Sequence, residues 1–458
     1  MPAPPNGLAS RAAPPLRALA AALALTTALS AHGQGSTWSG FNLPGFGPSS
    51  TQADEALVKL VIVSRHGVRT PIPQASELAH WSPSPWPEWR QPPGALTPRG
   101  AQLARIMGAY YRRYASEGQA TAAVGCPPIY VYADAMERTQ ITAQALIEGF
   151  SPNCGYTFRS RPDVKVDPLF HPLQAGVCRL DPMVAQTRVL ERAGGDLNRV
   201  TRDLKAPFEA LQSVLQCCSP ALCTAYGRGE KCTLPDLPTV MSPLPDGSGL
   251  ALMGALPIAS TTAELLLLEY ADGMPMEQVG FGRTALPQMR ETWRLHTEHY
   301  DLTQRTPYLA RRMGSALLFK VAAAVTSARS AGFGVVDPAI RDAKFVAYVG
   351  HDTNIWNLAG MLDTSWSQAG YQRNQTPPAG ALVFEVRETA DKKLKVYASY
   401  VAQSPEQLRN ATPLVGDVLP LRTPLRLPGC SSTQPGFACS IEEFAIAARN
   451  ALDRDCLE

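Results

Sequence analysis

The segment Arg65–Pro71 (RHGVRTP) carries side chains that could bind and process a phosphate group. It places two guanidinium groups and an imidazole within five residues, directly after an apolar run. Two arginines beside a histidine repel one another unless an anion lies between them, and planar guanidinium forks match the paired oxygens of a phosphate. Gly67 would let the backbone come close to that anion. The segment therefore predicts a phosphate site.

Two further segments carry matching chemistry. Tyr132–Thr139 (YADAMERT) supplies Arg138, and Gly350–Asn354 (GHDTN) supplies a histidine next to a carboxylate. Each of these two segments alone is weak evidence for a functional site, because a His-Asp pair is also typical of helix capping. All three segments follow predicted strands, and open α/β sheets bind ligands at the carboxyl ends of their strands. We therefore expect the three segments to form one site.

β-branched runs predict the strands that position these segments, at residues 57–64, 129–133 and 345–350. We expect a helix after each of them, over residues 97–114, 139–150 and 354–362, with Thr97-Pro98 as the cap and first turn of the first helix. The middle of the chain is typical of helices with loops, and its predicted helices are 183–193, 197–215 and 259–270. Strand signals return at 381–386 and 394–400. This order predicts an α/β domain made of residues 54–165 and 300–458, with an α-helical insertion at 166–299.

Composition excludes several classes of protein. The 458 residues are 45% hydrophobic and 18% charged, which is too apolar for a disordered chain and too long for one ordinary domain. The 42 Lys+Arg against 39 Asp+Glu leave a net charge of only +3, so we expect no nucleic-acid partner.

The N-terminus indicates export. Residues 1–30 have the pattern of a signal peptide, with two arginines before an apolar run and small residues after it, and residues 31–53 are typical of a linker. Nothing later in the chain has the length of a membrane-spanning helix, so we expect no membrane association.

Ten cysteines, an even number, indicate disulfides in an exported protein, and no paired CxxC blocks suggest a metal site. Two pairs could close local loops, Cys223 with Cys232 and Cys430 with Cys439. Cys217 and Cys218 are adjacent and do not easily bond to each other, so we expect at least one of them to have a distant partner.

The three motifs resemble those of the histidine acid phosphatases, the two-domain branch of the histidine phosphatase superfamily. Further matches are WPEW at 86–89, LTPRG at 96–100, DPLFHPLQAGVC at 167–178, QRTP at 304–307 and NQTPPAGALVFE at 374–385. They resemble the bacterial periplasmic phytases and acid phosphatases. The resemblance implies a three-layer α/β/α domain with a mixed, mostly parallel sheet and an inserted, mainly α-helical domain. It also implies a periplasmic location.

Carried over to this chain, the resemblance makes His66 the nucleophile that forms a phosphohistidine and Asp352 the proton donor to the leaving alkoxide. It implies that Arg65, Arg69, Arg138 and His351 clamp the phosphate oxygens. No cofactor and no metal are implied, because the arginines neutralise the developing charge. These cations should also lower the pKa of His66, so we expect an acidic pH optimum.

The substrate-binding residues implied by the resemblance are Thr70, Asp134, Glu264, His296, Arg305 and Thr353. The HDTN and QRTP motifs resemble those of phytases, so phytate is the leading substrate. However, Ile72-Pro73-Gln74 stands where phytases usually have a lysine, and WPEW resembles the glucose-1-phosphatases.

Three alternatives stay open. The first is the same chemistry on a sugar phosphate or on many monoesters. The second is an exported phosphate-binding module without turnover, against which an intact His66 and Asp352 argue. The third is a mutase-like activity, which is less favoured because the chain has an export signal and a large insertion able to cap a bulky substrate. We expect a monomer whose partner is a small phosphomonoester.

Overall fold

The computed structural model describes residues 55–116, 125–244, 249–328, 333–334 and 336–457. The predicted signal peptide at 1–30 and linker at 31–53 lie outside these residues. Within the described ranges, no helix has the length and apolar character needed to cross a membrane.

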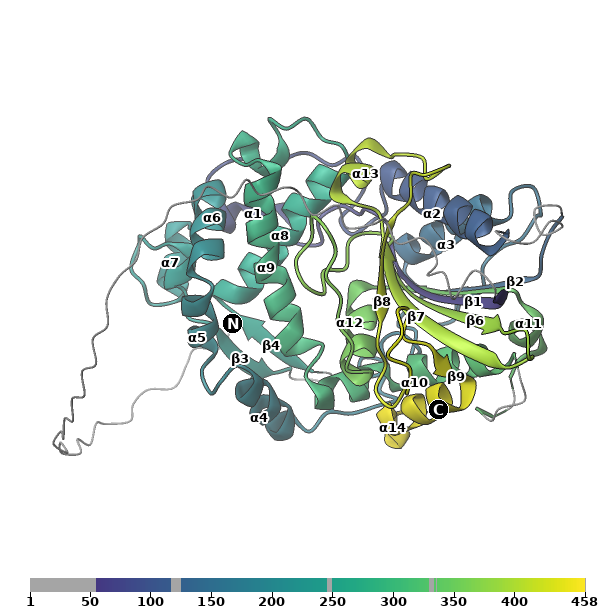
Figure 1. The fold of residues 1–458 in the computed structure, drawn as a ribbon. Coiled ribbons are helices and arrows are strands. Elements are labelled where there is room, and N and C mark those ends of the chain that lie inside the picture. Colours follow the sequence, from purple (N-terminus) through teal and green to yellow (C-terminus); the bar gives the residue numbers. More distant parts are fainter. Residues whose placement is uncertain (1–54, 117–124, 245–248, 329–332, 335, 458) are drawn as a thin grey trace, which may run out of the picture. The chain divides into compact units, whose positions relative to one another are not determined.

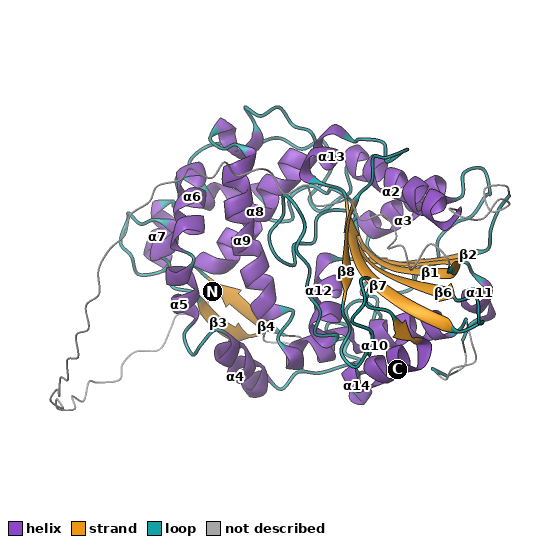
Figure 2. Ribbon diagram, viewed as in Figure 1, coloured by secondary structure: helices purple, strands orange, loops and turns teal. Residues whose placement is uncertain are grey.

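A mixed sheet of seven strands positions the three motifs (Figures 1 and 2). Its strands run in the order β2-β5-β1-β6-β7-β8, and β9 pairs with β7. The strands are β1 (Ala56–Arg65), β2 (Ile129–Ala133), β5 (Phe345–Gly350), β6 (Ala381–Glu388), β7 (Leu394–Ala402), β8 (Leu421–Leu425) and β9 (Cys439–Ser440). The five strands predicted from apolar runs are therefore confirmed.

Parallel pairing is limited to one side of the sheet. β2, β5 and β1 pair in parallel, whereas β6 to β9 are joined by antiparallel pairs. The mixed sheet is confirmed, but the expectation that it is mostly parallel is wrong. β6 and β7 are antiparallel because residues 389–393 connect them directly, and this connection is shorter than the dozen or so residues that a parallel crossover needs.

Helices cover both faces of the sheet, because successive side chains of a strand point to opposite sides. Leu60 and Ile62 of β1 pack with α2 (Pro98–Ser116) and α3 (Glu137–Phe150). Val61 and Val63 pack with α10 (Pro307–Thr326), α12 (Asp352–Met361) and α14 (Ile441–Ala451). Figure 1 shows α2 and α3 on one face and α10 and α14 on the other, which confirms the three layers.

The predicted cap of α2 is present. Oγ1 of Thr97 accepts a hydrogen bond from the backbone N–H of Gly100 at 3.0 Å. This satisfies one of the N–H groups that the first turn of a helix leaves without an intrahelical partner. The capped end fixes where α2 begins, next to the loop that follows β1.

A second group of helices lies between β2 and β5 in sequence and packs around its own apolar cluster, which includes Phe208, Leu266 and Trp293. It contains α4 (Pro182–Arg192), α5 (Leu197–Asp203), α6 (Lys205–Leu215), α7 (Pro220–Ala225), α8 (Ala255–Ala271), α9 (Leu286–Thr303) and a hairpin of β3 (Val240–Pro243) and β4 (Leu250–Met253). The single helix predicted at 197–215 is interrupted at Leu204, and the hairpin was not predicted.

The predicted insertion boundary at residue 299 falls inside α9, which continues to Thr303. We propose that the helical domain ends with α9. The remaining elements are α1 (Ala75–Trp81), α11 (Pro338–Asp342), α13 (Pro405–Asn410), η1 (Leu234–Asp236), η2 (Val279–Gly282) and η3 (Arg454–Cys456).

All ten cysteines form disulfides. The predicted local pairs Cys223–Cys232 and Cys430–Cys439 are confirmed. The expectation of a distant partner for Cys217 or Cys218 is wrong, because they bond to each other across a cis peptide and every other cysteine is already paired. The other two bonds are Cys126–Cys154 and Cys178–Cys456.

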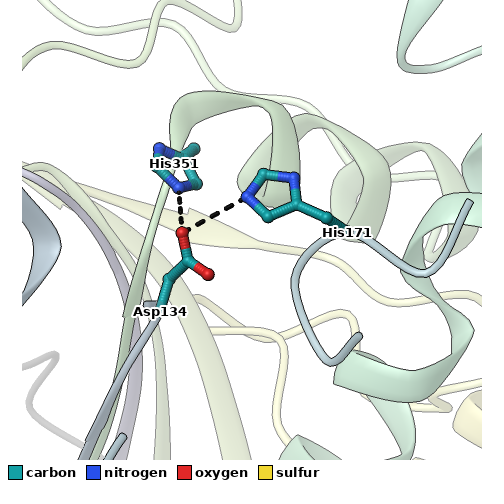
Figure 3. A group of neighbouring side chains, drawn as sticks. All are labelled: Asp134, His171 and His351. Atoms are coloured by element: carbon teal, nitrogen blue, oxygen red, sulfur yellow. Dashed lines mark hydrogen bonds and ion pairs between the residues drawn. The ribbon is translucent and has the colours of Figure 1, made fainter. Parts of the chain in front are cut away.

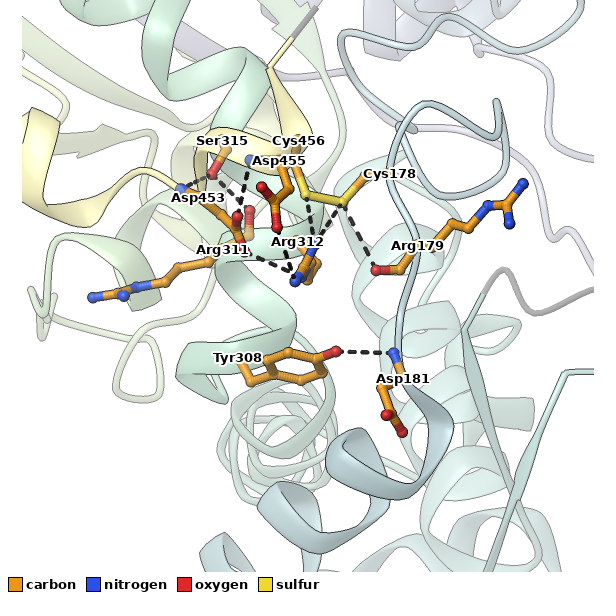
Figure 4. Close-up of a disulfide and its surroundings, with 10 residues drawn as sticks. All are labelled: Cys178, Arg179, Asp181, Tyr308, Arg311, Arg312, Ser315, Asp453, Asp455 and Cys456. Carbon is orange, nitrogen blue, oxygen red and sulfur yellow. Dashed lines mark hydrogen bonds and ion pairs between the residues drawn. A yellow bond between two sulfur atoms is a disulfide. The ribbon is translucent and has the colours of Figure 1, made fainter.

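The disulfide Cys178–Cys456 joins segments 278 positions apart (Figure 4). It lies beside Arg312 of α10, whose Nε is 3.1 Å from Oδ2 of Asp453. Nearby, the backbone N–H of Asp181 donates to the hydroxyl of Tyr308 at 2.9 Å. The segment leading into α4 is therefore covalently bonded to the C-terminal segment at Cys456 and hydrogen-bonded to α10.

Candidate active site

The parallel strands bring the three predicted motifs together. Arg65 at the end of β1 lies in register with Gly350 at the end of β5. The pairing continues one residue further, where the backbone N–H of His66 donates to the carbonyl of Gly350 at 2.9 Å. On the other side of β5, the N–H of Asp134 donates to Val349 at 3.0 Å. The motifs therefore meet at one edge of the sheet, as expected.

Gly67 has a packing role that the sequence did not indicate. A Cβ atom at this position would lie 2.5 Å from the carbonyl oxygen of Gly100, at the start of α2. Any side chain here would therefore collide with the backbone of α2. The glycine allows the loop after β1 and the N-terminus of α2 to touch.

His66 is buried and presents one defined nitrogen. Its Nδ1 lies 2.8 Å from the carbonyl oxygen of Gly67. A carbonyl only accepts, so Nδ1 carries the proton, and in the neutral ring Nε2 keeps its lone pair. Burial, together with the charges of Arg65 and Arg138, holds the pKa of His66 well below its ordinary 6.5. The imidazole is therefore neutral in mild acid, with a free lone pair on Nε2.

Asp352 begins α12 and faces Arg65. Its Oδ2 lies 3.1 Å from Nη2 of Arg65, and its Oδ1 accepts the backbone N–H of Thr353 at 2.8 Å. Burial raises the pKa of Asp352, but the charges around it, with Arg65 the largest contributor, together outweigh burial and lower the pKa to about 2. In this arrangement the carboxyl group is ionised.

Asp134 orients His351 and also contacts a second histidine (Figure 3). Its Oδ2 lies 2.7 Å from Nε2 of His351 and 3.3 Å from Nε2 of His171. Because a carboxylate only accepts, Nε2 of His351 carries a proton and its Nδ1 faces Nη2 of Arg138 at 3.4 Å. Burial lowers the pKa of His351 to about 4, although Asp134 opposes the shift.

These three residues could also hold a metal ion. One ligand atom of each lies within 4.8 Å of the others. However, Arg138 lies against His351, and a guanidinium ion repels a second cation at this distance. The hydrogen bonds that all three residues already make support a positioning role instead.

The helical side of the site is formed by α8 and α9. Glu264 of α8 pairs with Nη2 of Arg65, and its Oε2 lies 3.7 Å from Nε2 of His296 on α9. Nδ1 of His296 lies 3.1 Å from Oγ of Ser260. Glu264, predicted to touch the substrate, thus neutralises part of the charge of Arg65 and joins the helical region to β1.

The other predicted substrate-binding residues differ in their burial and in the partners that their side chains already have. The hydroxyl of Thr70 donates to the carbonyl of Pro92 at 2.6 Å and is buried. Thr353 is half-buried beside Asp352. Arg305 follows α9, two residues after its last residue Thr303, and its guanidinium carbon lies 5.9 Å from the ring centre of Trp356 on α12. It is not among the charged groups that act most strongly on His66.

The sequence analysis did not assign two residues of the site. His171 lies in a loop without a partner at ligand spacing, and only the fold brings it to Asp134. Tyr300 stands one helical turn after His296, with ring centres 4.3 Å apart, and that i, i+4 spacing is a signal that could have identified it.

The chain is similar to proteins of known activity. Residues 56–401 match the family "Histidine phosphatase superfamily (branch 2)". The chain is 35% identical over 413 residues to "Phytase AppA" of Escherichia coli (strain K12), covering 88% of this chain and 94% of that protein. It is 29% identical over 419 residues to "Glucose-1-phosphatase" of Providencia rettgeri, covering 90% and 95%.

A solved structure shows the same fold. The apo form of Hafnia alvei phytase superimposes with a TM-score of 0.81 at 32% identity, covering 90% of this chain and 100% of that one. The family match, the sequence identity to a phytase and the similarity to a solved phytase structure each cover most of the described chain. The chain therefore belongs to branch 2 of the histidine phosphatase superfamily and is a histidine acid phosphatase, a hydrolase of phosphoric monoesters.

Proposed function

We propose that this phosphatase is a phytase that works through a phosphohistidine on His66. The observation that carries the mechanism is the buried, neutral imidazole of His66 with a free Nε2, on which three guanidinium groups act: Arg65 at the end of β1, Arg69 in the loop after it and Arg138 in α3. Nε2 attacks phosphorus, and the bond from phosphorus to the ester oxygen breaks. Asp352 gives its proton to that oxygen, so the alcohol leaves neutral.

The second half of the reaction returns the enzyme to its starting state. A water oxygen attacks the phosphorus of the phosphohistidine, and Asp352 takes a proton from that water. The bond from phosphorus to Nε2 breaks, which releases phosphate and the free imidazole. Splitting one displacement into two lowers each barrier, and the arginines stabilise the charge on the non-bridging oxygens in both.

The ionised Asp352 becomes a donor when substrate binds. Arg65 and Arg69 help hold its pKa near 2. A phosphate dianion competes for the same guanidinium groups and adds negative charge beside the carboxyl group, and both effects raise the pKa of Asp352. The proton donor is therefore prepared by the substrate itself.

Relatives support phytate as the substrate. The relative named a phytase is 35% identical, whereas two named glucose-1-phosphatases are 29% and 27% identical. Hafnia alvei phytase has been solved in complex with myo-inositol hexakis sulphate, at a TM-score of 0.79 to this chain. Five disulfides fit an exported enzyme, and we propose the periplasm as its compartment.

The test compares phosphate release from phytate and from glucose 1-phosphate at about pH 5, near the ordinary titration range of carboxylates. Mature wild type and His66→Ala are measured side by side, with thermal unfolding as a check of folding. We expect higher kcat/KM on phytate for the wild type. Preference for glucose 1-phosphate would keep the mechanism and overturn the phytase assignment.

A further inference from the structure

Tyr300 of α9 has no role in the proposed mechanism, although it stands beside the catalytic cluster. Its ring centre lies 4.3 Å from that of His296, and the ring of Trp356 meets it edge-on with the centres 6.0 Å apart. Trp356 belongs to α12, the helix that begins with Asp352. Aromatic rings at these separations pack against one another. The phenol ring is therefore held between α9 and the helix that carries the proposed proton donor.

The hydroxyl group of Tyr300 is available to a ligand. It forms no hydrogen bond with any residue that the structure describes. The residue is only half-buried, and its oxygen is not among the buried polar atoms that lack a partner. The hydroxyl therefore reaches open space, whereas a buried tyrosine hydroxyl usually has a hydrogen-bond partner within the protein.

Four charged side chains of the site act on this hydroxyl. Burial raises the pKa of Tyr300 above its ordinary 10, and the charges of Asp352 and Glu264 raise it further. Arg65 and Arg69 act in the opposite direction. Such effects weaken with distance, so the hydroxyl lies near all four groups. Because its pKa is raised, the hydroxyl keeps its proton in mild acid and can donate a hydrogen bond.

The hydroxyl lies on the side of the site where the substrate alcohol leaves. Asp352, the proposed proton donor, acts on Tyr300 more strongly than any other charged group. His66 and Arg138 are not among the groups that act on it most strongly. Phosphoryl transfer places the attacking and leaving atoms roughly in line, on opposite sides of phosphorus. A group near Asp352 and further from His66 therefore faces the alcohol part of the substrate.

We propose that the hydroxyl group of Tyr300 donates a hydrogen bond to an oxygen of the alcohol part of the substrate, next to the reacting phosphate. The inference rests on the proposed function and deepens it. A phosphorylated polyol carries such an oxygen on the neighbouring carbon, as a hydroxyl group or as a further phosphate, whereas a simple aryl phosphate does not. Tyr300 thus favours phosphate esters of polyols without taking part in bond breaking.

Tyr300→Phe tests this contact, because it keeps the ring packed against His296 and Trp356 and removes only the hydroxyl group. The variant is measured on phytate, on glucose 1-phosphate and on p-nitrophenyl phosphate, which has no oxygen on the carbons next to the ester. We expect kcat/KM to fall roughly 10- to 100-fold on phytate, where the acceptor is charged, and roughly threefold to tenfold on glucose 1-phosphate. The value for p-nitrophenyl phosphate should not change.

Tyr156→Phe is the matched control, since the hydroxyl group of Tyr156 donates to the backbone carbonyl of Cys126 at 3.1 Å, in a loop outside the site. Its kinetic constants should equal those of the wild type on all three substrates. Thermal unfolding of each variant shows that it is folded. An equal loss on all three substrates in Tyr300→Phe would place the hydroxyl on the reacting phosphate and overturn the proposal. Unchanged kinetics on phytate and glucose 1-phosphate would overturn it as well.

Inhibition separates the role of Tyr300 from the phytase assignment. Myo-inositol hexakis sulphate is used as an inhibitor of p-nitrophenyl phosphate hydrolysis, which needs no turnover of phytate. The inhibition constant should rise roughly 10-fold or more in Tyr300→Phe and stay constant in Tyr156→Phe. If the wild type does not hydrolyse phytate but this pattern holds, the role of Tyr300 stands and the proposed substrate falls. If the inhibition constant is the same in all three proteins, the role of Tyr300 is overturned.

Discussion

Nη2 of Arg65 lies 3.1 Å from Oδ2 of Asp352, so the arginine proposed to bind phosphate also pairs with the proposed proton donor. Arg65 ends β1, and Asp352 begins α12 just after β5, the parallel neighbour of β1 in the sheet. Because one guanidinium serves both groups, phosphate binding and the protonation of Asp352 are coupled. Several measurable properties depend on this coupling.

Phosphate binding should be coupled to protonation of Asp352 at mildly acidic pH, so that the wild type takes up more protons, in net terms, than a variant without this carboxyl group. The pKa of Asp352 is about 2 in the structure and should rise when a dianion takes Arg65. Calorimetry of inorganic phosphate binding at about pH 5, in buffers of different ionisation enthalpy, measures the protons taken up. Asp352→Asn should take up fewer protons than the wild type. Equal uptake by the two proteins would argue against the coupling.

The same coupling predicts an acidic pH optimum. The low pKa of His66 keeps it neutral below pH 6.5, so nucleophilicity is retained in acid. Asp352 in the substrate complex must be protonated, so kcat should fall as pH rises through its pKa in the complex. A profile of kcat against pH that peaks above neutrality would contradict these two roles.

Asp352→Asn should slow the reaction according to the leaving group. Alkyl phosphates release a poor leaving group that needs a proton, so we expect kcat/KM, which reports the transfer to His66, to fall by about 10²- to 10⁴-fold. The nitrophenolate of p-nitrophenyl phosphate leaves without protonation, so kcat/KM for this substrate should fall much less. Initial rates at low concentrations of both substrates measure the difference. An equal loss of kcat/KM on both substrates would contradict the role of Asp352 as proton donor to the leaving group.

Asp134 should matter more than His171, although they contact each other. His351 lies at 2.7 Å from the shared carboxylate oxygen, whereas His171 lies at 3.3 Å and is partly exposed. We expect Asp134→Asn to lower kcat/KM about 10- to 100-fold, the range for one hydrogen bond to a charged group. His171→Asn keeps a hydrogen-bond donor and should lower kcat/KM by less than about threefold. The reverse order, in steady-state kinetics of the two variants, would show that His171 has the larger role.

Glu269 of α8 should make stability depend on pH. Burial, partly opposed by the hydrogen bond from the N–H of Gly280, raises its pKa to about 8 from 4.5. The folded state then binds a proton that the unfolded state has lost, so this contribution to stability is present below pH 4.5 and is lost as pH rises to 8.

Glu269→Gln tests this dependence because it removes the titration and keeps an acceptor for Gly280. Denaturant unfolding of both proteins gives the difference in free energy of unfolding. The variant should gain relative to the wild type as pH rises from 4.5 to 8, by at most about 1.4 kcal/mol per pH unit. A difference that does not change with pH would contradict a buried, titrating Glu269.

The sequence allowed the proposed catalytic centre to be predicted because its residues follow local signals. Apolar runs fixed three strands, and parallel strands must place their carboxyl ends together. Arg65 and Asp352 therefore meet although they are far apart in the chain. Contacts that depend on packing between domains carry no such signal. The pairing of Glu264 with Arg65 required α8 to be docked against β1.

The errors have physical causes too. The turn at 389–393 makes β6 and β7 antiparallel, and its length was visible in the sequence, but the apolar runs do not show strand direction. The bond between Cys217 and Cys218 depends on where the other eight cysteines lie. His171 lies in a loop whose path only the folded chain defines.

The most direct test of the mechanism is to trap the phosphorylated enzyme. Wild type is mixed with phytate, quenched within one turnover in alkaline denaturant, in which phosphohistidine survives, and digested for mass spectrometry. We expect a phosphate on the peptide that contains His66, and its absence together with a loss of turnover of about 10⁴-fold or more in His66→Ala. Phosphate release from the wild type without a phosphorylated His66 peptide, or turnover retained by His66→Ala, would contradict the account.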